Sequence, residues 1–382
     1  METNAGRNLW SHPSGHQLWG RTPWHEGRLS QHTPIPSRTD VVIVGGGLTG
    51  CSAAYHLARL GIRAAVLEAD LVASGASGRT GGLVLEGTAA GPMDRADDCV
   101  PRLAGLVERE RIRCDLQLPG VWEIGHSAGE KGAALPWTDE GKPVAISARV
   151  AGGTVEPALL NLGLAEAAIK AGASIFEQVR VSGIDLDSHL RVEYPGGTIR
   201  TDWVVVAANA WIRTLLPEIP IASSLTFACA TEVLDESVIA ELGLEKRIPF
   251  YTVDLPYLWG RITDEGRAVF GSGLLFGPPD ALEDTGPRTP SFVEEIEDLK
   301  FRIGTIHPAF LSVGIPYSWA GPIAFTRNQV PILCPVPGAT RVLVAGAYSG
   351  HGVAMSVRAG QMLALAISKD VPLPDWGSLS RH

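Results

Sequence analysis

The order of apolar and polar positions predicts a strand, a helix and a second strand between residues 40 and 70. VVIV (41–44) is a run of β-branched residues, typical of a buried strand. In LTGCSAAYHLARLG, which follows the glycines, small and apolar residues recur at helical spacing and stop at Gly61. The run IRAAVLE then predicts the second strand.

A similar alternation returns later in the chain. Residues 71–92 are rich in Gly, Ser and Ala and are expected to be a loop, and residues 94–112 are expected to be helical. Beyond residue 150, the pattern predicts a helix in PALLNLGLAEAAIKAG, strand material in ASIFEQVRVSGIDLD and a buried strand in TDWVVVAANAW. The segment TRVLVAGAYSGHGVAMSVRAGQMLALAIS predicts a strand, a Gly-rich turn and a helix.

Residues 225–330 have a different character. Strand-like runs such as YLWGRIT and RAVFGSG alternate with turns, and SFVEEIEDLKFRIGTIHP is an amphipathic helix. The chain is therefore expected to leave an α/β domain, form a second domain and return to the first.

Composition narrows the class of protein. The chain has 382 residues, of which 45% are hydrophobic and 19% charged, as in globular proteins with a large core. The net charge is −9 and no run of Lys or Arg occurs, which argues against nucleic-acid binding. No apolar stretch is long enough for a membrane helix or a signal peptide, so we expect no membrane partner.

The cysteines indicate a reducing compartment. The chain has 5, which lie far apart and form no CxxC pair: Cys51, Cys99, Cys114, Cys229 and Cys334. Scattered thiols of this kind are typical of a cytoplasmic protein.

The first 38 residues are polar and rich in Pro and His, and they contain Trp10, Trp19 and Trp24. The tryptophans suggest that part of this leader packs onto the body of the protein; the alternative is a flexible leader. His12 and His16 stand four residues apart, but Pro13 and Gly15 between them disfavour a helix. We therefore expect no metal site.

A glycine motif stands between the first strand and its helix. Gly45, Gly47 and Gly50 form G-x-G-x-x-G, in which the first glycine permits a tight turn, the second lets a pyrophosphate approach and the third lets helix and strand pack closely. The start of the helix presents free N–H groups to phosphates. Glu68 ends the second strand, 18 residues after Gly50, where a carboxylate can bind ribose hydroxyls. This context predicts a dinucleotide site; the alternative is a Gly-rich turn with a surface glutamate.

Two further segments favour FAD over NAD. ASGASGRTGG (73–82) is a second Gly-rich loop that could wrap a larger cofactor, and its Arg79 could pair with the pyrophosphate or be solvated. The turn SGHG leads into a helix near Val353 whose N-terminus could face a developing anion.

The chain resembles the FAD-dependent amino-acid and amine oxidase family, the group of D-amino acid oxidase, glycine oxidase and sarcosine oxidase. Within it, the likeness is nearest to gamma-glutamylputrescine oxidoreductase-like members. The resemblance rests on DVVIVGGGLTG, GASGRTGG, WVVVAANAW, YLWGRIT with VFGSG, WAGPIAFTRNQVP and VAGAYSGHGVAMSVRAG, and it spans residues 40 to 360.

The resemblance implies an α/β fold (α+β overall), with a Rossmann-like FAD-binding domain and a discontinuous mixed-sheet substrate domain. We expect an N-terminal extension over 1–38, the FAD-binding domain over 39–92, 150–222 and 335–382, and the substrate domain over 93–149 and 223–334. The implied reaction is oxidation of the C–N bond of an amine or amino acid to an imine, by hydride transfer to flavin N5 and then hydrolysis. The partners are a small amine and O₂ or another electron acceptor, and the oligomeric state stays open.

The motifs also assign residues. The resemblance implies that FAD, bound noncovalently, is held by Gly45, Gly47, Leu48, Thr49, Gly50, Glu68, Ala69, Arg79, Thr80, Gly81, Gly82, Val179, Ala207, Trp211, Gly346, Ser349, Gly350, His351, Gly352 and Val353. Val179 is expected in a strand segment that contacts adenine through its backbone. Closest to the reacting groups we expect His351, Trp259 and Trp319. His351 is placed beside flavin or substrate without acid–base catalysis; the alternative is a turn histidine packed under the ring. The expected substrate-domain strands carry Tyr251, Tyr257, Trp259, Arg261, Tyr317 and Trp319. An aromatic cage for an ammonium group would draw on such residues, and the alternative, for about half of them, is ordinary packing in the core of a sheet.

Departures from the family pattern bear on the substrate. Ala354 and Ile323 stand where relatives carry a lysine or an arginine for the substrate carboxylate, and Arg327 lies four residues further on. We therefore expect an amine, or an amino acid whose acid lies far from the reacting nitrogen.

Two other departures concern the flavin. Val269 or Phe270 replaces the lysine that speeds the reaction of sarcosine oxidase with O₂, so a dehydrogenase remains an alternative. The segment YSWAG lacks the cysteine that anchors flavin in sarcosine oxidase-like members, and Cys334 is read as an ordinary buried thiol. Two other functions also stay open: a flavin-dependent hydroxylase, although no second nucleotide motif is evident, and a protein with structural FAD.

Overall fold

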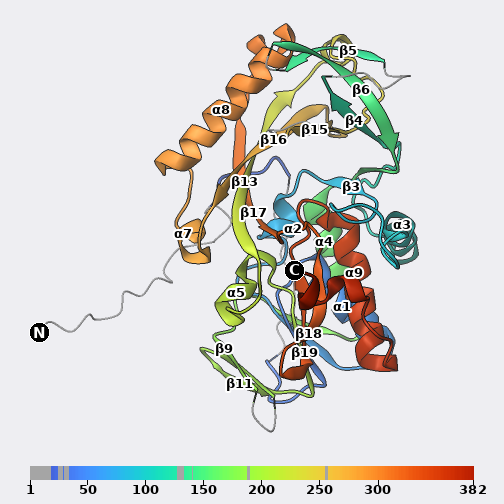
Figure 1. Ribbon diagram of the computed structural model, residues 1–382, viewed down its shortest axis with the longest axis vertical. Coiled ribbons are helices and arrows are strands. Elements are labelled where there is room, and N and C mark those ends of the chain that lie inside the picture. The colour runs from blue at the N-terminus through green and yellow to red at the C-terminus, as the bar shows by residue number, and fades with distance from the viewer. Residues whose placement is uncertain are drawn as a thin grey trace, which may run out of the picture.

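The computed structural model describes residues 19–24, 29, 34–126, 133–139, 141–186, 190–253 and 257–382. Two large sheets lie one above the other along the long axis of the molecule (Figure 1). The lower sheet has 6 strands, in the order β18 (Ile332–Val336), β19 (Ala339–Gly346), β12 (Trp203–Val206), β1 (Val41–Val44), β2 (Ala64–Leu67) and β8 (Ser174–Phe176). All neighbouring pairs are parallel except β18 with β19.

The central strand β1 is buried on both faces, because layers cover both sides of this sheet. Val41 and Ile43 belong to a core cluster shared with α1 (Leu48–Arg59), α3 (Cys99–Glu110), α4 (Pro157–Ala171) and α9 (Gly352–Lys369). Val42 and Val44 face a second cluster, built with α5 (Ile212–Leu215) and with the small sheet of β9 (Gly183–Asp185), β10 (Arg191–Tyr194) and β11 (Gly197–Arg200).

The upper sheet has 8 strands, in the order β17 (Tyr317–Phe325), β13 (Ala222–Val233), β16 (Arg267–Phe276), β15 (Trp259–Ile262), β14 (Phe250–Thr252), β4 (Val121–Gly125), β6 (Lys142–Val150) and β5 (Ala134–Asp139). All pairs are antiparallel except β14 with β4. Its outer face packs against α8 (Pro290–Ile306) through Leu299 and Ile303 (Figure 1). Its inner face is turned toward the lower sheet.

The remaining elements are short. They are α2 (Ala76–Arg79), α6 (Glu236–Glu241), α7 (Pro279–Glu283), the strand pair β3 (Leu83–Leu85) and β7 (Gly152–Thr154), and 3-10 turns at Asn209–Trp211, Pro308–Ser312, Asp375–Gly377 and Leu379–Arg381. Within the part of the chain that the structure describes, no helix is both long and apolar enough to cross a membrane.

The expected α/β architecture is confirmed. The helix from Leu48 ends just before Gly61, and α4 ends at Gly172, which adopts φ +110° in the left-handed region. Two local expectations were wrong: the segment 71–92 contains α2 and β3, and Val179 lies in the irregular segment after β8. Leu103 of α3 packs in the core of the lower sheet, beyond the boundary proposed at residue 93.

Candidate active site

The glycine motif forms a tight cradle at the carboxyl end of β1. Gly45 has φ +105°, which favours glycine, and a Cβ on Gly50 would collide with the carbonyl oxygen of Gly45. The Gly46 peptide is held from both sides: Asn161 donates to its oxygen at 2.9 Å, and its N–H donates to Glu68 Oε2 at 2.6 Å. The turn is therefore fixed before any ligand binds.

Glu68 lies at the end of β2 beside this cradle. Its second oxygen accepts from the N–H of Asp70 at 2.9 Å. Burial raises the pKa of this carboxyl, while the two N–H donors act in the opposite direction. The position agrees with the expected ribose contact, which stays a prediction. Ala69 follows it on the surface, and the N–H of Val179 is already used by the Glu68 carbonyl at 2.8 Å.

The second Gly-rich loop touches the start of α1. The N–H of Leu48 donates to Ser77 Oγ at 2.9 Å, which brings α2 against the glycine cradle. Arg79 is 5% exposed, and it donates from Nε to the Ser74 oxygen and from Nη1 to the Gly20 oxygen. These contacts give Arg79 a role in holding the leader, and its expected pairing with a pyrophosphate stays a prediction.

The C-terminal turn brings a second cradle to the same place. Ala347, Ser349 and Gly350 have positive φ between β19 and α9, and Asn209 Oδ1 accepts from the Ala347 N–H at 3.0 Å. His351 is the N-cap of α9, and its Nδ1 is buried without a hydrogen bond to any residue that the structure describes. Burial lowers the pKa of His351, so its imidazole is neutral at neutral pH.

Tyr348 joins the two cradles. Its hydroxyl lies 2.7 Å from Thr49 Oγ1 at the start of α1, although the residues are 299 positions apart. Burial raises the pKa of Tyr348 to about 12, so the phenol stays protonated. The starts of α1 and α9 are therefore coupled directly, a contact that the sequence analysis missed.

The inner face of the upper sheet carries a row of paired residues across six strands. The row is Trp319, Ala228, Gly271, Trp259, Tyr251 and Glu123. Small residues in the middle of the row make room for the Trp259 indole. The indole lies against Gly271 and against Gly81 of the second Gly-rich loop, and a Cβ on either glycine would collide with the ring. The Tyr251 hydroxyl lies 2.5 Å from Glu123 Oε1.

The two expected tryptophans differ in their surroundings. Trp259 is half-buried, whereas Trp319 is 0% exposed and donates from its indole to the Arg79 oxygen at 2.9 Å. The structure therefore gives Trp319 a supporting place behind the loop, and its direct part in the pocket stays a prediction. Tyr251 shares the inner face, while Tyr257 is 50% exposed.

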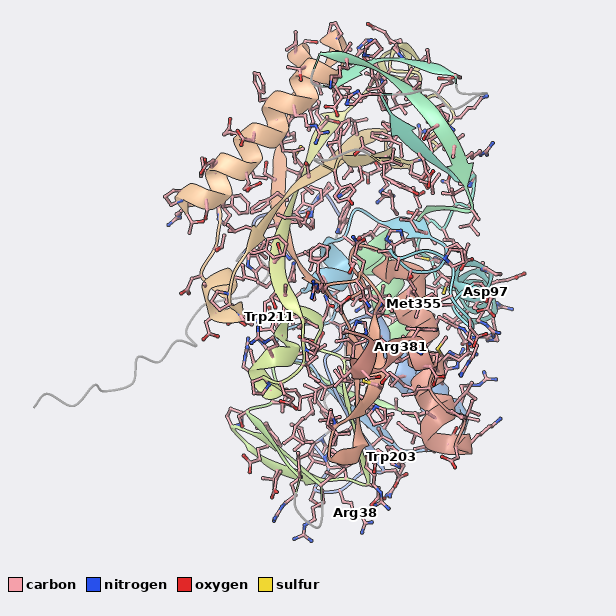
Figure 2. All side chains as sticks on the ribbon, in the orientation of Figure 1. Arg38, Asp97, Trp203, Trp211, Met355 and Arg381 are labelled. Atoms are coloured by element: carbon pink, nitrogen blue, oxygen red, sulfur yellow. The ribbon has the colours of Figure 1, made fainter. Side chains whose placement is uncertain are left out.

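Part of the leader packs onto this region. Trp19 is buried and donates to the Leu282 oxygen at 2.9 Å, and Gly20 pairs with Trp319 along the free edge of β17. Trp24 donates to the Gly78 oxygen at 2.7 Å. Trp211, labelled in Figure 2, lies 5.5 Å from Trp19 between ring centroids, and its indole nitrogen is buried without a partner in the described part of the chain. Trp10 and the leader histidines lie outside the described residues.

The structure shows where the residues that depart from the family pattern lie. Val269 faces the inner cluster with Trp319, and Phe270 packs outward against the α8 side, so Val269 is the one of the two that is turned toward the lower sheet. Ala354 is buried in α9, Ile323 is on β17 and Arg327 lies in the exposed turn after it. Cys334 packs in the cluster of the small sheet, and all five cysteines are free and buried.

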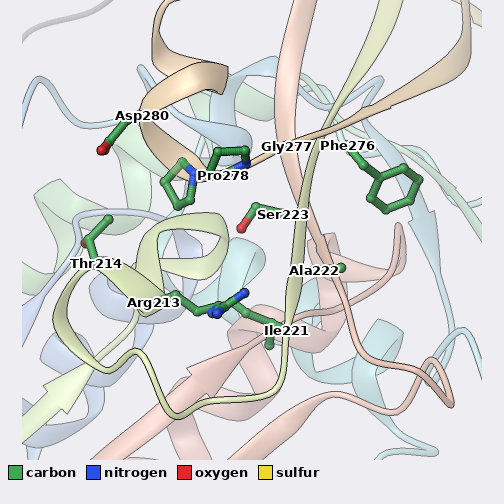
Figure 3. A pocket seen from close by; sticks show the side chains of 10 residues that line it. Arg213, Thr214, Ile221, Ala222, Ser223, Phe276, Gly277, Pro278 and Asp280 are labelled. Carbon is green, nitrogen blue, oxygen red and sulfur yellow. The ribbon is translucent and has the colours of Figure 1, made fainter.

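A separate cleft opens between α5 and α7. Arg213, Ser223, Pro278 and Asp280 lie on its walls (Figure 3). None of its lining residues was assigned to cofactor or substrate by the sequence. In the described part of the chain, no group of three or more His, Cys, Asp or Glu side chains is arranged to hold a metal ion.

The two cradles and the sheet above them define a dinucleotide-dependent oxidoreductase. A family model described as FAD dependent oxidoreductase (DAO) matches residues 40–366, and the chain belongs to this family.

Individual relatives agree with this assignment. The probable oxidoreductase OrdL of Rhizobium meliloti (strain 1021) is 28% identical over 92% of this chain and 89% of its own length. The gamma-glutamylputrescine oxidoreductase of Escherichia coli (strain K12) is 26% identical over 87% of this chain and 84% of its own length. The crystal structure of glycine oxidase from Geobacillus kaustophilus has a TM-score of 0.74 at 21% identity and covers 91% of this chain and 100% of that one, which shows the same fold.

The residues present fit FAD. Gly45 and Gly50 leave room for close approach to the start of α1, Glu68 offers a carboxylate beside it, and His351 Nδ1 and Trp211 Nε1 are buried donors or acceptors without partners. Glu123, Asn161 and Tyr348 are candidate positioning residues that the sequence did not single out, and Trp24 was noted only as a leader residue that packs onto the body. The acid within the strand VWEIG and the tyrosine just before SGHG are the signals that could have pointed to Glu123 and Tyr348.

Proposed function

We propose that this protein oxidises the C–N bond of an amine, or of an amino acid whose carboxylate is remote from the reacting nitrogen, to an imine. Noncovalent FAD, when bound, supplies the two-electron acceptor. The substrate loses a hydride from carbon and a proton from nitrogen, and water then hydrolyses the imine to a carbonyl compound and ammonia, or an amine where the substrate nitrogen carries a second carbon group. An external acceptor, O₂ or another, takes the electrons in the second half of the cycle.

The observation that carries this proposal is the position of Trp259. Its indole lies against Gly81 of the loop that the motifs assign to FAD, and Tyr251 and Glu123 follow it along one row. An aromatic face and a carboxylate at this place are suited to bind a substrate ammonium group and to orient its C–H bond. The residues of this chain bind and orient the amine, and Trp259 excludes water from the face of the sheet.

The absence of cationic residues at two positions supports the substrate class. Ile323 and Ala354 are uncharged, and Arg327 lies in an exposed turn. A carboxylate beside the reacting nitrogen would lose its hydration at these positions without an ion partner, which is unfavourable. The name of the gamma-glutamylputrescine relative also favours an amine.

The test is an anaerobic amine screen on the purified holoenzyme, with the flavin absorption as the readout. We expect n-alkylamines, diamines or ω-amino acids to bleach the flavin, and glycine, sarcosine and D-alanine to act far more slowly. Fast bleaching by these three α-amino acids would refute the substrate class. Bleaching by NADPH alone would favour a hydroxylase, and no bleaching by any of them would favour structural FAD.

The electron acceptor has its own test. Val269 offers no charge on the cofactor side of β16. After anaerobic reduction, slow reoxidation in air together with fast reoxidation by a dye would identify a dehydrogenase. Fast reoxidation in air would identify an oxidase.

A further inference from the structure

Arg261 is an arginine on the inner face of the upper sheet. It follows Trp259 by two residues on β15, so both side chains point to the same face. The side chain is 6% exposed. Its guanidinium carbon lies 5.7 Å from the centroid of the Trp24 ring, and a Cβ on Gly82 would lie 3.1 Å from Nη2. Arg261 is therefore enclosed between the leader, the sheet and the FAD loop.

This guanidinium has no anionic partner. Among the described residues it makes no hydrogen bond and no ion pair within 4.0 Å, and its Nε is buried without an acceptor. Arginine carries five N–H donors that normally find acceptors when they are buried. Its contact with Trp24 is a cation–π contact, which satisfies none of them.

The same fold pairs another enclosed arginine fully. Arg302 of α8 donates to both carboxylate oxygens of Asp139, at 2.8 and 2.5 Å, and the two side chains are 13% and 6% exposed. Among the described residues, no carboxylate pairs with Arg261 in this way. Glu156 is the strongest charge that acts on it, but both Glu156 oxygens already cap α4, accepting from Ala158 and Leu159.

The charge on Arg261 persists at neutral pH. Burial lowers its pKa to about 10, which leaves the guanidinium protonated. An enclosed cation without a counter-ion is unfavourable, and a carboxylate that binds it through two parallel N–H bonds removes that penalty.

We propose that Arg261 binds the remote carboxylate of the substrate, so that the substrates are ω-amino acids or larger amines that end in an acid. This inference rests on the proposed function. Arg261 and Trp259 are two residues apart on one strand, so their Cα atoms are separated by roughly 7 Å. With the amine at Trp259 and the acid at Arg261, the two groups are joined by several methylene groups. An α-amino acid carries both groups on one carbon and is therefore a poorer match to two recognition groups set apart along the strand.

The test uses the holoenzyme and three variants: Arg261→Gln, Arg261→Lys, and Arg341→Gln as a control, because Arg341 is exposed on β19. Glutarate, a dicarboxylate that cannot be oxidised at nitrogen, is titrated while the flavin absorption is recorded, and neutral glutaramide is the matched probe. We expect saturable perturbation by glutarate only, weakened roughly tenfold or more in Arg261→Gln, partly restored in Arg261→Lys and unchanged in Arg341→Gln. Equal binding of glutarate and glutaramide to the wild-type enzyme would overturn the proposal even if no Arg261 variant folds.

FAD is the other possible source of an acceptor for Arg261. The FAD dissociation constant of each apoprotein, measured by flavin fluorescence, separates the two sources. We expect Arg261→Gln to retain FAD affinity within about twofold of wild type. Loss of FAD affinity with unchanged glutarate binding would assign the arginine to the cofactor and overturn the proposal.

A matched substrate pair separates this inference from the proposed function. Anaerobic flavin reduction by 5-aminopentanoate is compared with reduction by n-pentylamine, which lacks only the acid. Faster reduction by 5-aminopentanoate that disappears in Arg261→Gln supports both proposals. Equal rates with the two amines, unaffected by Arg261→Gln, would overturn the anchor while the amine oxidation stands. Arg261-dependent binding of glutarate without reduction by either amine would retain the anchor and overturn the proposed reaction.

Discussion

Trp24 and Trp319 meet edge to face, with ring centroids 5.3 Å apart and planes at 76°. Their indole nitrogens donate to neighbouring carbonyls of one loop, Trp24 to Gly78 and Trp319 to Arg79. A leader residue and a residue of the upper sheet thus hold the same Gly-rich loop in place. The leader also covers the free edge of β17, which would otherwise be open to pairing with another strand.

Replacing Trp24 with Phe should weaken FAD binding. The variant keeps an aromatic ring but loses the bond to Gly78, a loss of about 1 kcal/mol. Trp376→Phe is the matched control, because Trp376 donates to the Asp94 oxygen and makes no hydrogen bond to Gly78 or Arg79 among the described residues. We expect both variants to lower the melting temperature, and only Trp24→Phe to raise the FAD dissociation constant. Equal FAD affinity in the two variants would show that the leader does not order the loop.

Two Gly→Ala substitutions in helices should have opposite effects. Gly50→Ala adds a methyl group that collides with the carbonyl oxygen of Gly45. The turn must move away from α1 to relieve this collision, so FAD binding should be lost. Gly105 lies in α3 with nothing within 4 Å of the added methyl, so Gly105→Ala should be neutral or stabilise by about 0.5–1 kcal/mol. Urea unfolding and flavin content measure both effects. Full FAD occupancy in Gly50→Ala would contradict the assigned cradle.

Glu123 should contribute to binding of the amine. Glu123→Gln removes the negative charge beside Tyr251, so we expect KM for the amine to rise roughly tenfold with a smaller change in kcat. Tyr251→Phe should show a weaker effect in the same direction. Glu297→Gln serves as the control for charge, because Glu297 pairs with Lys300 on the exposed side of α8. An unchanged KM in Glu123→Gln would place the amine elsewhere.

The stability of the apoprotein should fall in mild acid, in part through His351. Its pKa is lowered by burial, so the unfolded chain binds the proton more readily below pH 6.5, and folded stability is lost as pH falls from there. His56 acts in the same direction, with a pKa lowered to about 4. His351→Asn should therefore reduce the loss of unfolding free energy between pH 7.5 and 5.5 without abolishing it. Identical slopes for the variant and the wild type would show that His351 is not shielded from water.

The parts of the fold that depend on neighbouring residues could be predicted from the sequence. Gly45, Gly50 and the β-branched run before them define the first strand, turn and helix within twenty residues, where local backbone preferences act directly. The short α2 was missed because GASGR has the composition of a loop, and it is held by a distant contact of Ser77 with Leu48.

The candidate site depends on strand register, which local patterns do not determine. The row from Trp319 to Glu123 requires six strands to align across 197 positions, from 123 to 319. The alternation of apolar and polar residues within a single strand does not predict that Trp319 is fully buried behind a loop while Trp259 is only half-buried. Arg79 donates to Gly20 of the leader and Trp24 of the leader donates to Gly78, and the docking of the leader carries no periodic signal in the sequence.

The hydrogen bond between Thr49 and Tyr348 has a consequence for biosynthesis. The two hydroxyl groups are separated by 299 positions, and β1 lies beside β12 and is completed by β19 from the far end of the chain. A ribosome must release nearly the whole polypeptide before the first glycine turn acquires its last neighbours. Nascent chains that stop before β19 begins at residue 339 will display an unfinished edge at β12, so quality-control proteases should recognise truncated products even when most of the sequence has been made.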